Sequence, residues 1–358
     1  MPNAPIPWSD AARRGEFERW FAGIAPRHGL APGTLEPASA DASFRRYLRV
    51  QARAAEGAAE GAERSFIVMD APPPQEDVRP FVKVAQLAAA AGVHAPSVLE
   101  CDEARGFLLL SDLGRRSYLD ALREAQDTNP AEADRLMRAA LDALVCWQAG
   151  VPAAALPRHD QALIEAELAL FPEWCVRREF GIEWTDVQQA AWKRLVLLLA
   201  GSALAQPVVA VHADYMPRNL MVCEPLPGVL DFQDAMAGAI SYDLASLLRD
   251  AFISWPEEQE IDWAVRYWQA ARRAALPVPE DFGEFWRALE WMGLQRHLRV
   301  LGVFCRLKHR DGKPHYARDL PRFFGYCTKV ALRYRPLAPL LALLEPMSGR
   351  EVSAGFTF

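Results

Sequence analysis

Cysteine is scarce in this chain, and its six cysteines show no pairing pattern. No two of them have the CxxC spacing of zinc knuckles, and their distribution does not suggest a disulfide framework. The sequence therefore favours thiols that fill the core of a protein in the reducing cytoplasm. The cysteines stand at positions 101, 146, 175, 223, 305 and 327 of the 358 residues.

The sequence also lacks an apolar run long enough for a secretory signal or a membrane span. Prolines and charged residues interrupt its first twenty positions, and the most apolar later stretch, 195–211, is broken by Gln206 and Pro207. A signal core and a spanning helix both need uninterrupted apolar residues. We therefore predict neither export nor contact with a membrane.

Clustered positive charge is the third feature that is lacking. With 40 basic and 46 acidic residues, the formal net charge is -6. Binding to a phosphate backbone normally needs a clustered basic surface, so nucleic acid is not an expected partner. Hydrophobic residues make up 51% of the chain, which is enough for a continuous core in one large domain or two moderate ones. No segment indicates an obligate protein partner.

What the chain does contain changes along its length. The first third has short β-branched and aromatic runs that predict five strands, and helical spacing over 78–91 predicts one helix. Small and charged residues over 52–63 predict a flexible hairpin tip that buries no core face. The expected strands cover 34–37, 46–50, 65–69, 97–101 and 106–111.

Helical periodicity dominates beyond Asp112. The fold class predicted is α+β: a small lobe of residues 1–112 with a five-stranded antiparallel sheet, and a larger, mostly helical lobe of residues 113–358. Two short strands, at 207–211 and 228–231, interrupt the helical part, so that Asp231 ends a strand. The expected helices cover 130–150, 160–180, 185–203, 240–253, 257–274, 281–308 and 319–333.

The strongest chemical signal lies at these two short strands. The chain reads HADYMPRN over 212–219 and LDFQD over 230–234. A proline inside the first motif prevents a continuous helix, so Asp214 and Asn219 can turn toward one point. Phosphoryl transfer from a nucleotide needs a proton acceptor for an alcohol and hard oxygen ligands for Mg²⁺. We therefore predict a nucleotide-dependent kinase with Asp214 as catalytic base and Asn219 and Asp231 as magnesium ligands.

Three polar residues near these motifs leave alternatives open. His212 is expected to brace the loop backbone rather than to react. Asp234 either helps to bind metal or water, or orders the turn that follows it. Asp243 either caps a helix or anchors the catalytic loop, since Asp is favoured at helix starts.

The segment 40–47 lies where a nucleotide kinase has its phosphate-covering loop, yet it contains no glycine. A loop without glycine brings its backbone against phosphate less freely. We expect side chains to compensate, with the nucleotide contacted by Ser43, Phe44, Arg45 and Arg46. The alternative is a solvated hairpin.

Together these strings resemble the aminoglycoside phosphotransferase and choline kinase superfamily, whose members are relatives of protein kinases. The longer text resembles one branch of it, the kinases that phosphorylate the anomeric C1 hydroxyl of N-acetylmuramate and N-acetylglucosamine in bacterial cell-wall recycling. The strings that carry the resemblance are DASFRRY at 41–47, VMDAP at 68–72, HADYMPRNLM at 212–221, GVLDFQDA at 228–235 and SLLRD at 246–250.

The resemblance implies a two-lobe, protein-kinase-like fold and a product that is a sugar 1-phosphate. It assigns the base and the two metal ligands as above, with ATP and Mg²⁺ as cofactors. An anomeric hydroxyl is more acidic than an ordinary alcohol, so positioning and charge neutralisation should dominate catalysis. The hinge that offers backbone groups to adenine would comprise Ser111, Asp112 and Leu113.

One position departs from the wider kinase pattern. The third strand, over 66–70, has no lysine to bind phosphate, and the following helix has Lys83 where a glutamate would be expected. One hypothesis is a reversed pair between Asp70 and Lys83. The other is that Arg45 or Arg46 meets the phosphates.

Basic residues of the long helix near the C-terminus are candidates for the sugar site. A muramate carries a lactyl carboxylate, which a basic side chain can bind through a charge-assisted contact. The candidate sugar contacts are His297 and Arg306 there, with Arg218 and Asp234 beside the motifs. The alternative is a helix whose basic residues face solvent.

Two other functions remain open at this point. One is the same chemistry on choline, an amino alcohol or an aminoglycoside, although the basic stretch disfavours these cationic substrates. The other is an inactive nucleotide-binding regulatory module, which the missing strand lysine would suggest. The presence of Asp214, Asn219 and Asp231 together argues against the second.

Overall fold

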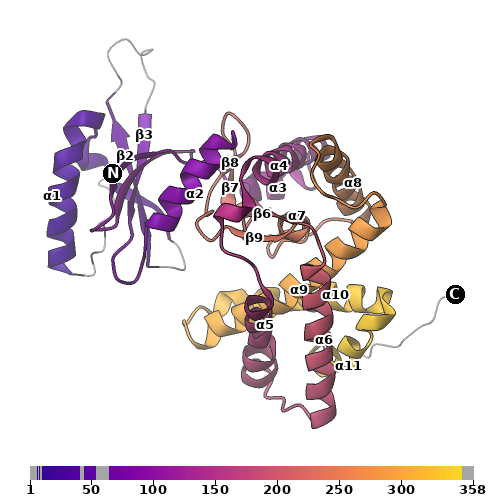
Figure 1. The fold of residues 1–358 in the computed structure, drawn as a ribbon. Helices are drawn as coiled ribbons and strands as arrows, with labels where there is room; N and C mark the ends of the chain where they lie inside the picture. Colours follow the sequence, from indigo (N-terminus) through magenta and orange to yellow (C-terminus); the bar gives the residue numbers. More distant parts are fainter. Residues whose placement is uncertain (1–5, 7, 9, 41–43, 54–63, 349–358) are drawn as a thin grey trace. The chain divides into compact units, whose positions relative to one another are not determined.

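The computed structural model describes residues 6, 8, 10–40, 44–53 and 64–348 (Figure 1). The predictions for Ser43 and for most of the hairpin tip over 52–63 lie outside the described residues. The chain divides into two compact units. Unit 1 comprises Met1–Ser117 with Leu220–Asp234, and unit 2 comprises Tyr118–Asn219 with Ala235–Phe358.

This division differs from the predicted boundary at Asp112 because a distant segment packs with the first unit. Val222 N donates to Arg116 O at 2.8 Å, and Val229 N donates to His94 O at 2.7 Å. These are backbone bonds between segments more than a hundred positions apart. The segment that contains Asp231 is therefore part of unit 1, whereas the segment that contains Asp214 is part of unit 2.

Unit 1 contains the predicted five-stranded antiparallel sheet, in the order β1-β2-β3-β5-β4. Its β-branched and aromatic residues alternate between the two faces, as strand geometry requires. Ser111, the first residue of the predicted hinge, is also the last residue of β5 and pairs with Phe66 of β3. The strands are β1 Glu36–Ala40, β2 Arg46–Ala52, β3 Arg64–Asp70, β4 Val98–Asp102 and β5 Phe107–Ser111.

Among the described residues before Asp112 there are two α-helices, rather than the one predicted. They are α1, Ala11–His28, and α2, Arg79–Ala90. In α1 the Asp10 side chain accepts from Arg13 N at 2.6 Å, and Gly29 ends the helix at φ 64°, a conformation that glycine adopts without steric cost. The proline-rich start and the Pro26 inside the helix obscured this helix in the sequence.

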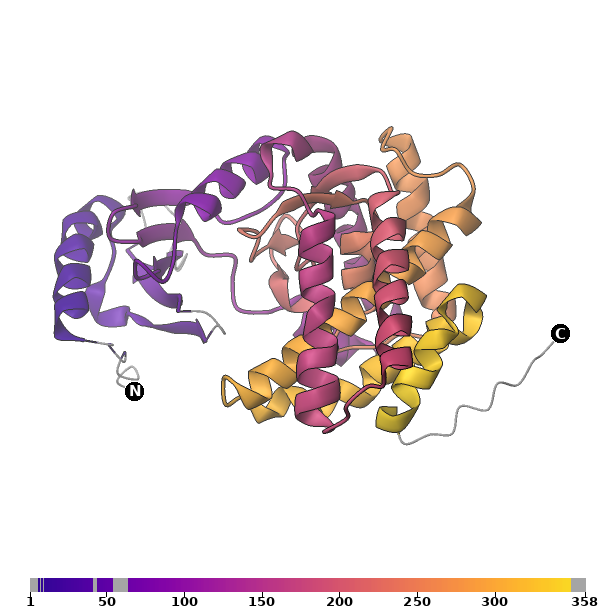
Figure 2. The same ribbon diagram turned by 60° about the horizontal axis from the view of Figure 1, so that its bottom comes forward.

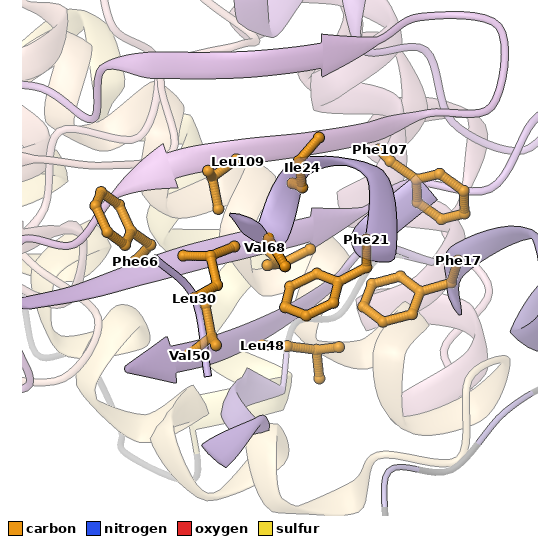
Figure 3. Packing of buried hydrophobic residues seen from close by; sticks show 11 residues of the cluster. Phe17, Phe21, Ile24, Leu30, Leu48, Val50, Phe66, Val68, Phe107 and Leu109 are labelled. Atoms are coloured by element: carbon orange, nitrogen blue, oxygen red, sulfur yellow. The ribbon is translucent and has the colours of Figure 1, made fainter. Parts of the chain in front are cut away.

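Helix α1 covers one face of the sheet and forms the core of unit 1 with it (Figure 3). The strand residues in this core are spaced two apart, because alternate side chains of a strand share a face. Helix α2 lies on the other side of the sheet (Figure 1). The core comprises Phe17, Phe21, Ile24, Ala25, Leu30, Leu48, Val50, Phe66, Val68, Phe107 and Leu109.

Unit 2 is mostly helical, as predicted, around one small two-stranded sheet. In that sheet β6, Val208–Val211, pairs antiparallel with β9, Met236–Ala239. A second hairpin, β7 Leu220–Met221 with β8 Gly228–Val229, belongs to unit 1. The α-helices of unit 2 are α3 Tyr118–Ala125, α4 Pro130–Gly150, α5 Gln161–Leu170, α6 Asp186–Leu204, α7 Tyr242–Leu248, α8 Glu257–Arg273, α9 Phe282–His309, α10 Leu320–Arg333 and α11 Pro339–Ser348.

Helix α9 is central to unit 2 and contacts α5, α6, α7, α8 and α10. Helices α5 and α6 lie side by side (Figure 2). The single helix predicted over 160–180 is instead α5 followed by a π-helical stretch, η3, Phe171–Glu179. Its second residue is Pro172, whose missing N–H disfavours the regular α-helical hydrogen bond at that point.

Short helical turns connect the main elements, and in unit 2 the α-helices α3 and α11 were not predicted. No described helix is both long enough and apolar enough to cross a membrane. The turns are η1 Pro32–Thr34 in unit 1, and η2 Ala153–Ala155, η4 Pro217–Asn219, η5 Pro314–Asp319 and η6 Arg335–Leu337 in unit 2.

Candidate active site

The candidate catalytic loop begins directly after β6 and is held by one buried carboxylate. Asp243, on α7, accepts hydrogen bonds from His212 N at 2.7 Å and from Ala213 N at 3.1 Å. Ala213 has φ 79°, a left-handed conformation that is uncommon for a residue other than glycine. Asp243 therefore anchors the loop, which was one of its two predicted roles, and stabilises a strained backbone beside Asp214.

The surroundings of Asp243 oppose its ionisation. Burial raises the pKa of the carboxyl to about 7, although its two backbone donors and the charge of Arg296 lower it. The negative charge of Asp214 raises it further. The anchor therefore titrates near neutrality, because removing its carboxylate from water costs more free energy than the hydrogen bonds and the charge of Arg296 recover.

Aromatic packing fixes the loop on its inner side. The His212 ring is fully buried and lies 5.5 Å from the rings of both Trp147 and Tyr215. The Tyr215 hydroxyl donates to Ala140 O in α4 at 2.7 Å. This burial supports the prediction that His212 braces the loop, because a ring enclosed in this way cannot reach a substrate.

The next residues turn the backbone so that the Asp214 carbonyl and the Asn219 side-chain amide lie close together. Asp214 O accepts from Met216 N at 2.9 Å and from Asn219 Nδ2 at 3.0 Å. Asn219 ends the short turn η4, and its N–H donates to Met216 O at 2.8 Å. The Asp214 side chain is partly exposed. The structure therefore brings together Asp214 and Asn219, as their spacing predicted.

The second motif lies in unit 1, after β8. That strand ends at Val229, so Asp231 follows the strand by two residues rather than ending it. Asp231 has φ 63°, and its Oδ1 accepts from Gln233 Nε2 at 2.9 Å. Phe232 is buried against Phe81 of α2, with ring centroids 4.8 Å apart. The aromatic residue packs inward, which fixes the backbone on either side of it.

Asn219 and Asp231, each within its own unit, carry oxygen donors of types that Mg²⁺ accepts. No three described His, Cys, Asp or Glu side chains cluster as a protein-only metal site. Magnesium is typically bound by one or two protein oxygens together with phosphates and water. One carboxylate, Asp231, and one amide oxygen, Asn219, are the right donor types for that arrangement.

The side chains of the predicted hinge, Ser111 to Leu113, make contacts within unit 1. Asp112 accepts from Arg49 Nη2 at 2.9 Å and from Ser65 Oγ at 2.7 Å. Burial raises the pKa of Asp112, but these two hydrogen bonds outweigh it and hold the pKa below its ordinary value. Ser111 Oγ accepts from Ser97 N at 2.8 Å, and Leu113 is buried.

The two arginines of the glycine-free loop have different surroundings. Arg46 donates to the fully buried Asp70 and lies over the ring of Trp8, at 4.3 Å. Asp70 also accepts from Arg13 Nε at 3.0 Å. Two arginines therefore satisfy Asp70, the carboxylate for which a pair with Lys83 was hypothesised.

Arg45 instead lies near the carboxylates of Glu76 and Asp234. Its Nε is 2.9 Å from Glu76 Oε2, and Phe44 N donates to the same carboxylate at 3.2 Å. Burial lowers the pKa of Arg45, but the charges of Tyr47, Glu76 and Asp234 outweigh it and raise the pKa. Asp234, which also belongs to unit 1, is thus close enough to raise the pKa of Arg45.

Comparison with known proteins places this geometry in a family. Residues 34–290 match the model of the phosphotransferase enzyme family. That match spans more than half of the chain and includes both motifs. The chain belongs to this phosphotransferase family.

Two relatives of this phosphotransferase have the same name, N-acetylmuramate/N-acetylglucosamine kinase. The protein from Pseudomonas aeruginosa is 50% identical over 346 residues, which cover 95% of this chain and 98% of the relative. The protein from Pseudomonas putida is 51% identical over 315 residues, which cover 88% of each. The sequence-based identification of the superfamily is therefore confirmed.

A solved structure supports the fold of the phosphotransferase. Plasmodium vivax ethanolamine kinase has a TM-score of 0.59 and 12% identity, with 89% of each chain covered. At that identity the likeness shows the fold alone. Together with the five-stranded sheet and the helical unit 2, it confirms the predicted protein-kinase-like fold.

The remaining predicted residues of the phosphotransferase differ in their access to solvent. Arg218 and Asp234 are exposed, and Arg218 lies over the Phe252 ring at 5.3 Å. Arg306 is partly exposed, and burial together with Arg310 lowers its pKa. His297 is only 1% exposed and stacks on Tyr326, with centroids 4.7 Å apart. Burial lowers the pKa of His297 to about 3, so this residue is a neutral core side chain and a sugar cannot reach it.

Sequence reasoning missed several residues that organise the phosphotransferase. Glu76 holds both Arg45 and the backbone of Phe44, and Arg13 of the unpredicted α1 reaches Asp70. Glu167, on α5, meets His159 and Arg299. The spacing of Phe17, Phe21 and Ile24 could have revealed α1, but no local pattern indicates the long-range ion pairs.

Proposed function

We propose that this phosphotransferase is an ATP-dependent sugar kinase that phosphorylates the anomeric C1 hydroxyl of N-acetylmuramate and N-acetylglucosamine. The product is the sugar 1-phosphate, a reaction of peptidoglycan recycling in the cytoplasm. The observation that carries the proposal is the 50% identity over 95% of the chain to a relative with that name. The anchored loop with Asp214 and Asn219 supports it, because it supplies the groups that the chemistry needs.

The roles follow from the chemistry of each group. Asp214 accepts the proton of the C1 hydroxyl, and Asn219 and Asp231 would hold Mg²⁺, which would neutralise charge on the transferred phosphoryl group. The backbone of Ser111, Asp112 and Leu113 binds adenine. Most of the barrier is lowered by alignment and charge neutralisation, since the loop is held in place before the substrate binds.

Arg45 is the residue that we assign to the phosphates in place of the missing strand lysine. It is held by Glu76 and influenced by Asp234, whereas Arg46 is engaged with the buried Asp70. A glutamate that holds a phosphate-binding cation is the arrangement that kinases achieve with a lysine–glutamate pair. Ser43 and Phe44 belong to the same proposed nucleotide-binding loop.

Three of the four predicted sugar contacts remain part of the proposal. Arg218 and Asp234 are exposed beside the motifs, and Arg306 is partly exposed on α9. His297 is left out because of its burial. A small amino sugar and ATP are then the partners of the protein.

The direct test is turnover with identification of the product. Purified protein is incubated with ATP and Mg²⁺ and, in separate reactions, N-acetylmuramate, N-acetylglucosamine, choline and an aminoglycoside. We expect ADP release and a phosphorus NMR signal of a sugar 1-phosphate with the first two. Turnover of choline or the aminoglycoside alone would move the function to another alcohol, and nucleotide binding without turnover would favour a regulatory module.

The Asp214→Asn variant tests the role of the base. Asparagine keeps the shape but cannot accept the proton, so we expect turnover to fall at least about a hundredfold. Nucleotide affinity, measured by calorimetry, should stay within about twofold, because the hinge and Arg45 are unchanged. Turnover close to that of the wild type would exclude Asp214 as the base.

A further inference from the structure

A charged cluster in unit 2 lies next to the catalytic loop and has no role in the reaction described so far. Arg299 Nε is 3.3 Å from Glu167 Oε1, and Arg299 Nη1 donates to the Tyr242 hydroxyl at 3.3 Å. Glu167 Oε2 is 3.2 Å from Nε2 of His159. The cluster thus joins α5, α7, α9 and the segment before α5 through polar side chains.

The cluster is attached to the strands that lead into the catalytic loop. His159 N donates to Ala237 O of β9 at 2.9 Å, and Ala237 pairs with Ala210 of β6, two residues before His212. Tyr242 immediately precedes Asp243, the anchor of the loop. Short backbone connections therefore fix the cluster relative to Asp214.

The electrostatics agree with this placement. Burial raises the pKa of Tyr242, Arg299 and Arg296 lower it, and the charges of Glu167 and Asp214 raise it. Asp214 is therefore near enough to act on the tyrosine that Arg299 contacts. Burial also raises the pKa of Glu167, but His159 and Arg299 outweigh it and keep the pKa below its ordinary value, so that the carboxylate is ionised and can hold Arg299.

Only part of the cluster is accessible to a ligand. His159 and Tyr242 are buried, Glu167 is 14% exposed, and Arg299 is 28% exposed. Arg296, whose guanidinium lies 5.0 Å above the Tyr242 ring, is also buried. Arg299 thus combines a position set by Glu167 and Tyr242 with the exposure that a ligand contact requires.

The two proposed substrates differ by one charged group. N-acetylmuramate carries a lactyl ether on C3 that ends in a carboxylate, and N-acetylglucosamine has a hydroxyl there. When C1 lies at Asp214, the carboxylate on the C3 substituent lies at another part of the sugar. The side chain that binds this carboxylate must therefore be close to the catalytic loop but outside it. A guanidinium is suited to this task, because its planar donors match a carboxylate in two-point contact.

We propose that Arg299, positioned by Glu167 and Tyr242, binds the lactyl carboxylate of N-acetylmuramate and thereby sets the preference between the two sugars. This inference rests on the proposed function and names the residue that distinguishes the two sugars. Arg306 is the rival for the same carboxylate, but it lies seven residues further along α9, about 10 Å from Arg299 along the helix axis. Lys308 and His309 both contact Glu179.

The test compares three sugars in steady-state kinetics. Wild type and Arg299→Gln are assayed with N-acetylmuramate, N-acetylglucosamine and the neutral lactyl amide of N-acetylmuramate. We expect the substitution to raise KM for N-acetylmuramate at least about tenfold with little change in kcat, because a charge-assisted contact is lost. KM for the other two sugars should change less than about twofold. Arg299→Lys should restore part of the affinity, since it keeps the charge but not the planar fork.

Matched variants separate this role from a structural one. Arg310→Gln changes an exposed arginine one residue beyond α9 that pairs with its neighbour Asp311, and should leave all three KM values unchanged. Equal losses on all three sugars with Arg299→Gln, an unaltered KM for N-acetylmuramate, or a selective loss with Arg306→Gln instead would each overturn the assignment. Thermal melts of all variants check that they fold.

Failure of the proposed function gives a different result. In that case the wild type phosphorylates neither sugar under any condition tested. Calorimetric titration of N-acetylmuramate and its lactyl amide into the wild type and Arg299→Gln then still tests the assignment. Tighter binding of the acid than of the amide, lost with the substitution, supports it, and equal or absent binding of both overturns it.

Discussion

Two residues with left-handed backbone conformations lie in the two motifs. Ala213, at φ 79°, precedes the proposed base, and Asp231, at φ 63°, is itself a proposed metal ligand. Residues other than glycine reach this region at a cost of about 1 kcal/mol or more. The surrounding structure must supply that free energy: Asp243 accepts a hydrogen bond from Ala213 N, and Phe232, next to Asp231, packs on Phe81.

The left-handed conformation of Asp231 allows a clean test of the metal site. Asparagine tolerates this backbone region nearly as well as aspartate, so Asp231→Asn removes the charge without adding strain. In the wild type at 100 times Kd, MgATP should stabilise the fold by about 2.7 kcal/mol. We expect the variant to lose the part of this stabilisation that depends on Mg²⁺ and to keep the part seen with ATP in EDTA.

Thermal melts with ATP, with and without Mg²⁺, measure this difference. Asp262→Asn, which changes an exposed aspartate on α8 that pairs with Arg266, serves as the matched control. A magnesium-dependent shift in Asp231→Asn as large as that of the wild type would remove Asp231 from the metal site.

The anchor Asp243 should make stability depend on pH. Its pKa is about 7 in the folded protein, whereas an aspartate side chain in water has an ordinary value of 3.8. Between these values the native state holds a proton that the unfolded chain has released, so rising pH favours unfolding by at most about 1.4 kcal/mol per pH unit. The contribution is complete below pH 4 and is lost as the pH rises through 7.

Urea unfolding at pH 5 and pH 7 measures this effect. Asp243→Asn has no group that titrates at this position, so the free energy of unfolding of the wild type should fall more between the two pH values than that of the variant. Asp250, whose pKa burial raises to about 6, contributes equally to both proteins and cancels in the comparison. Identical pH dependence in both proteins would contradict the raised pKa.

At the scale of elements, the close packing of α9 against α5 depends on a missing side chain. A Cβ added at Gly302 would lie 2.4 Å from the carbonyl carbon of Leu170, which is backbone that cannot move aside. Leu170 is the last residue of α5, where the chain changes to the π-helical η3. Glycine is therefore required at this position by contact rather than by its backbone angles.

Opposite effects are expected from the same substitution at two helical glycines. Gly302→Ala should destabilise the protein by about 1–3 kcal/mol through overpacking. Gly201→Ala, in α6, meets nothing within 4 Å and should stabilise it by about 0.5–1 kcal/mol, because alanine favours helix. Chemical denaturation of both variants measures the pair, and a stabilising Gly302→Ala would refute the close contact.

At the scale of the whole molecule, neither compact unit is a continuous piece of chain. Unit 1 receives residues 220–234 from the middle of the sequence, and these residues bring Asp231 with them. Besides the backbone bonds of Arg116 and His94, the His94 ring contacts Pro225 O at 2.6 Å. The proposed nucleotide hinge and Asp231 thus share one unit, while Asp214 and Asn219 belong to the other.

This arrangement predicts how fragments will behave. A fragment of residues 1–117 lacks Phe232 to cover Phe81, and it lacks Val229, whose N–H donates to His94 O. We expect it to unfold at lower urea than the same fragment with residues 220–234 attached through a flexible linker. Circular dichroism in urea measures both midpoints, and equal midpoints would show that the segment adds no stability to unit 1.

Local patterns in the sequence were sufficient for the motifs and for most of the elements. The α4 helix and the five strands follow from periodicity, because half-buried elements repeat their apolar residues at 3.6 or 2 positions. The spacing of Asp214, Asn219 and Asp231 follows from the chemistry of phosphoryl transfer. Such features involve neighbours in the chain, and each can be read within a short window.

Tertiary structure alone decided which side chains are accessible and which are paired. His297 and Arg299 belong to one helix with one basic pattern, yet packing buries the first and exposes part of the second. Likewise, Arg45 and Arg46 are adjacent, but Asp70 engages one and Glu76 the other. The partners are 24 to 57 positions apart for Asp70 with Arg46 and Arg13. Burial and ion pairing depend on which distant segments meet in the fold, and a local sequence pattern carries no information about that.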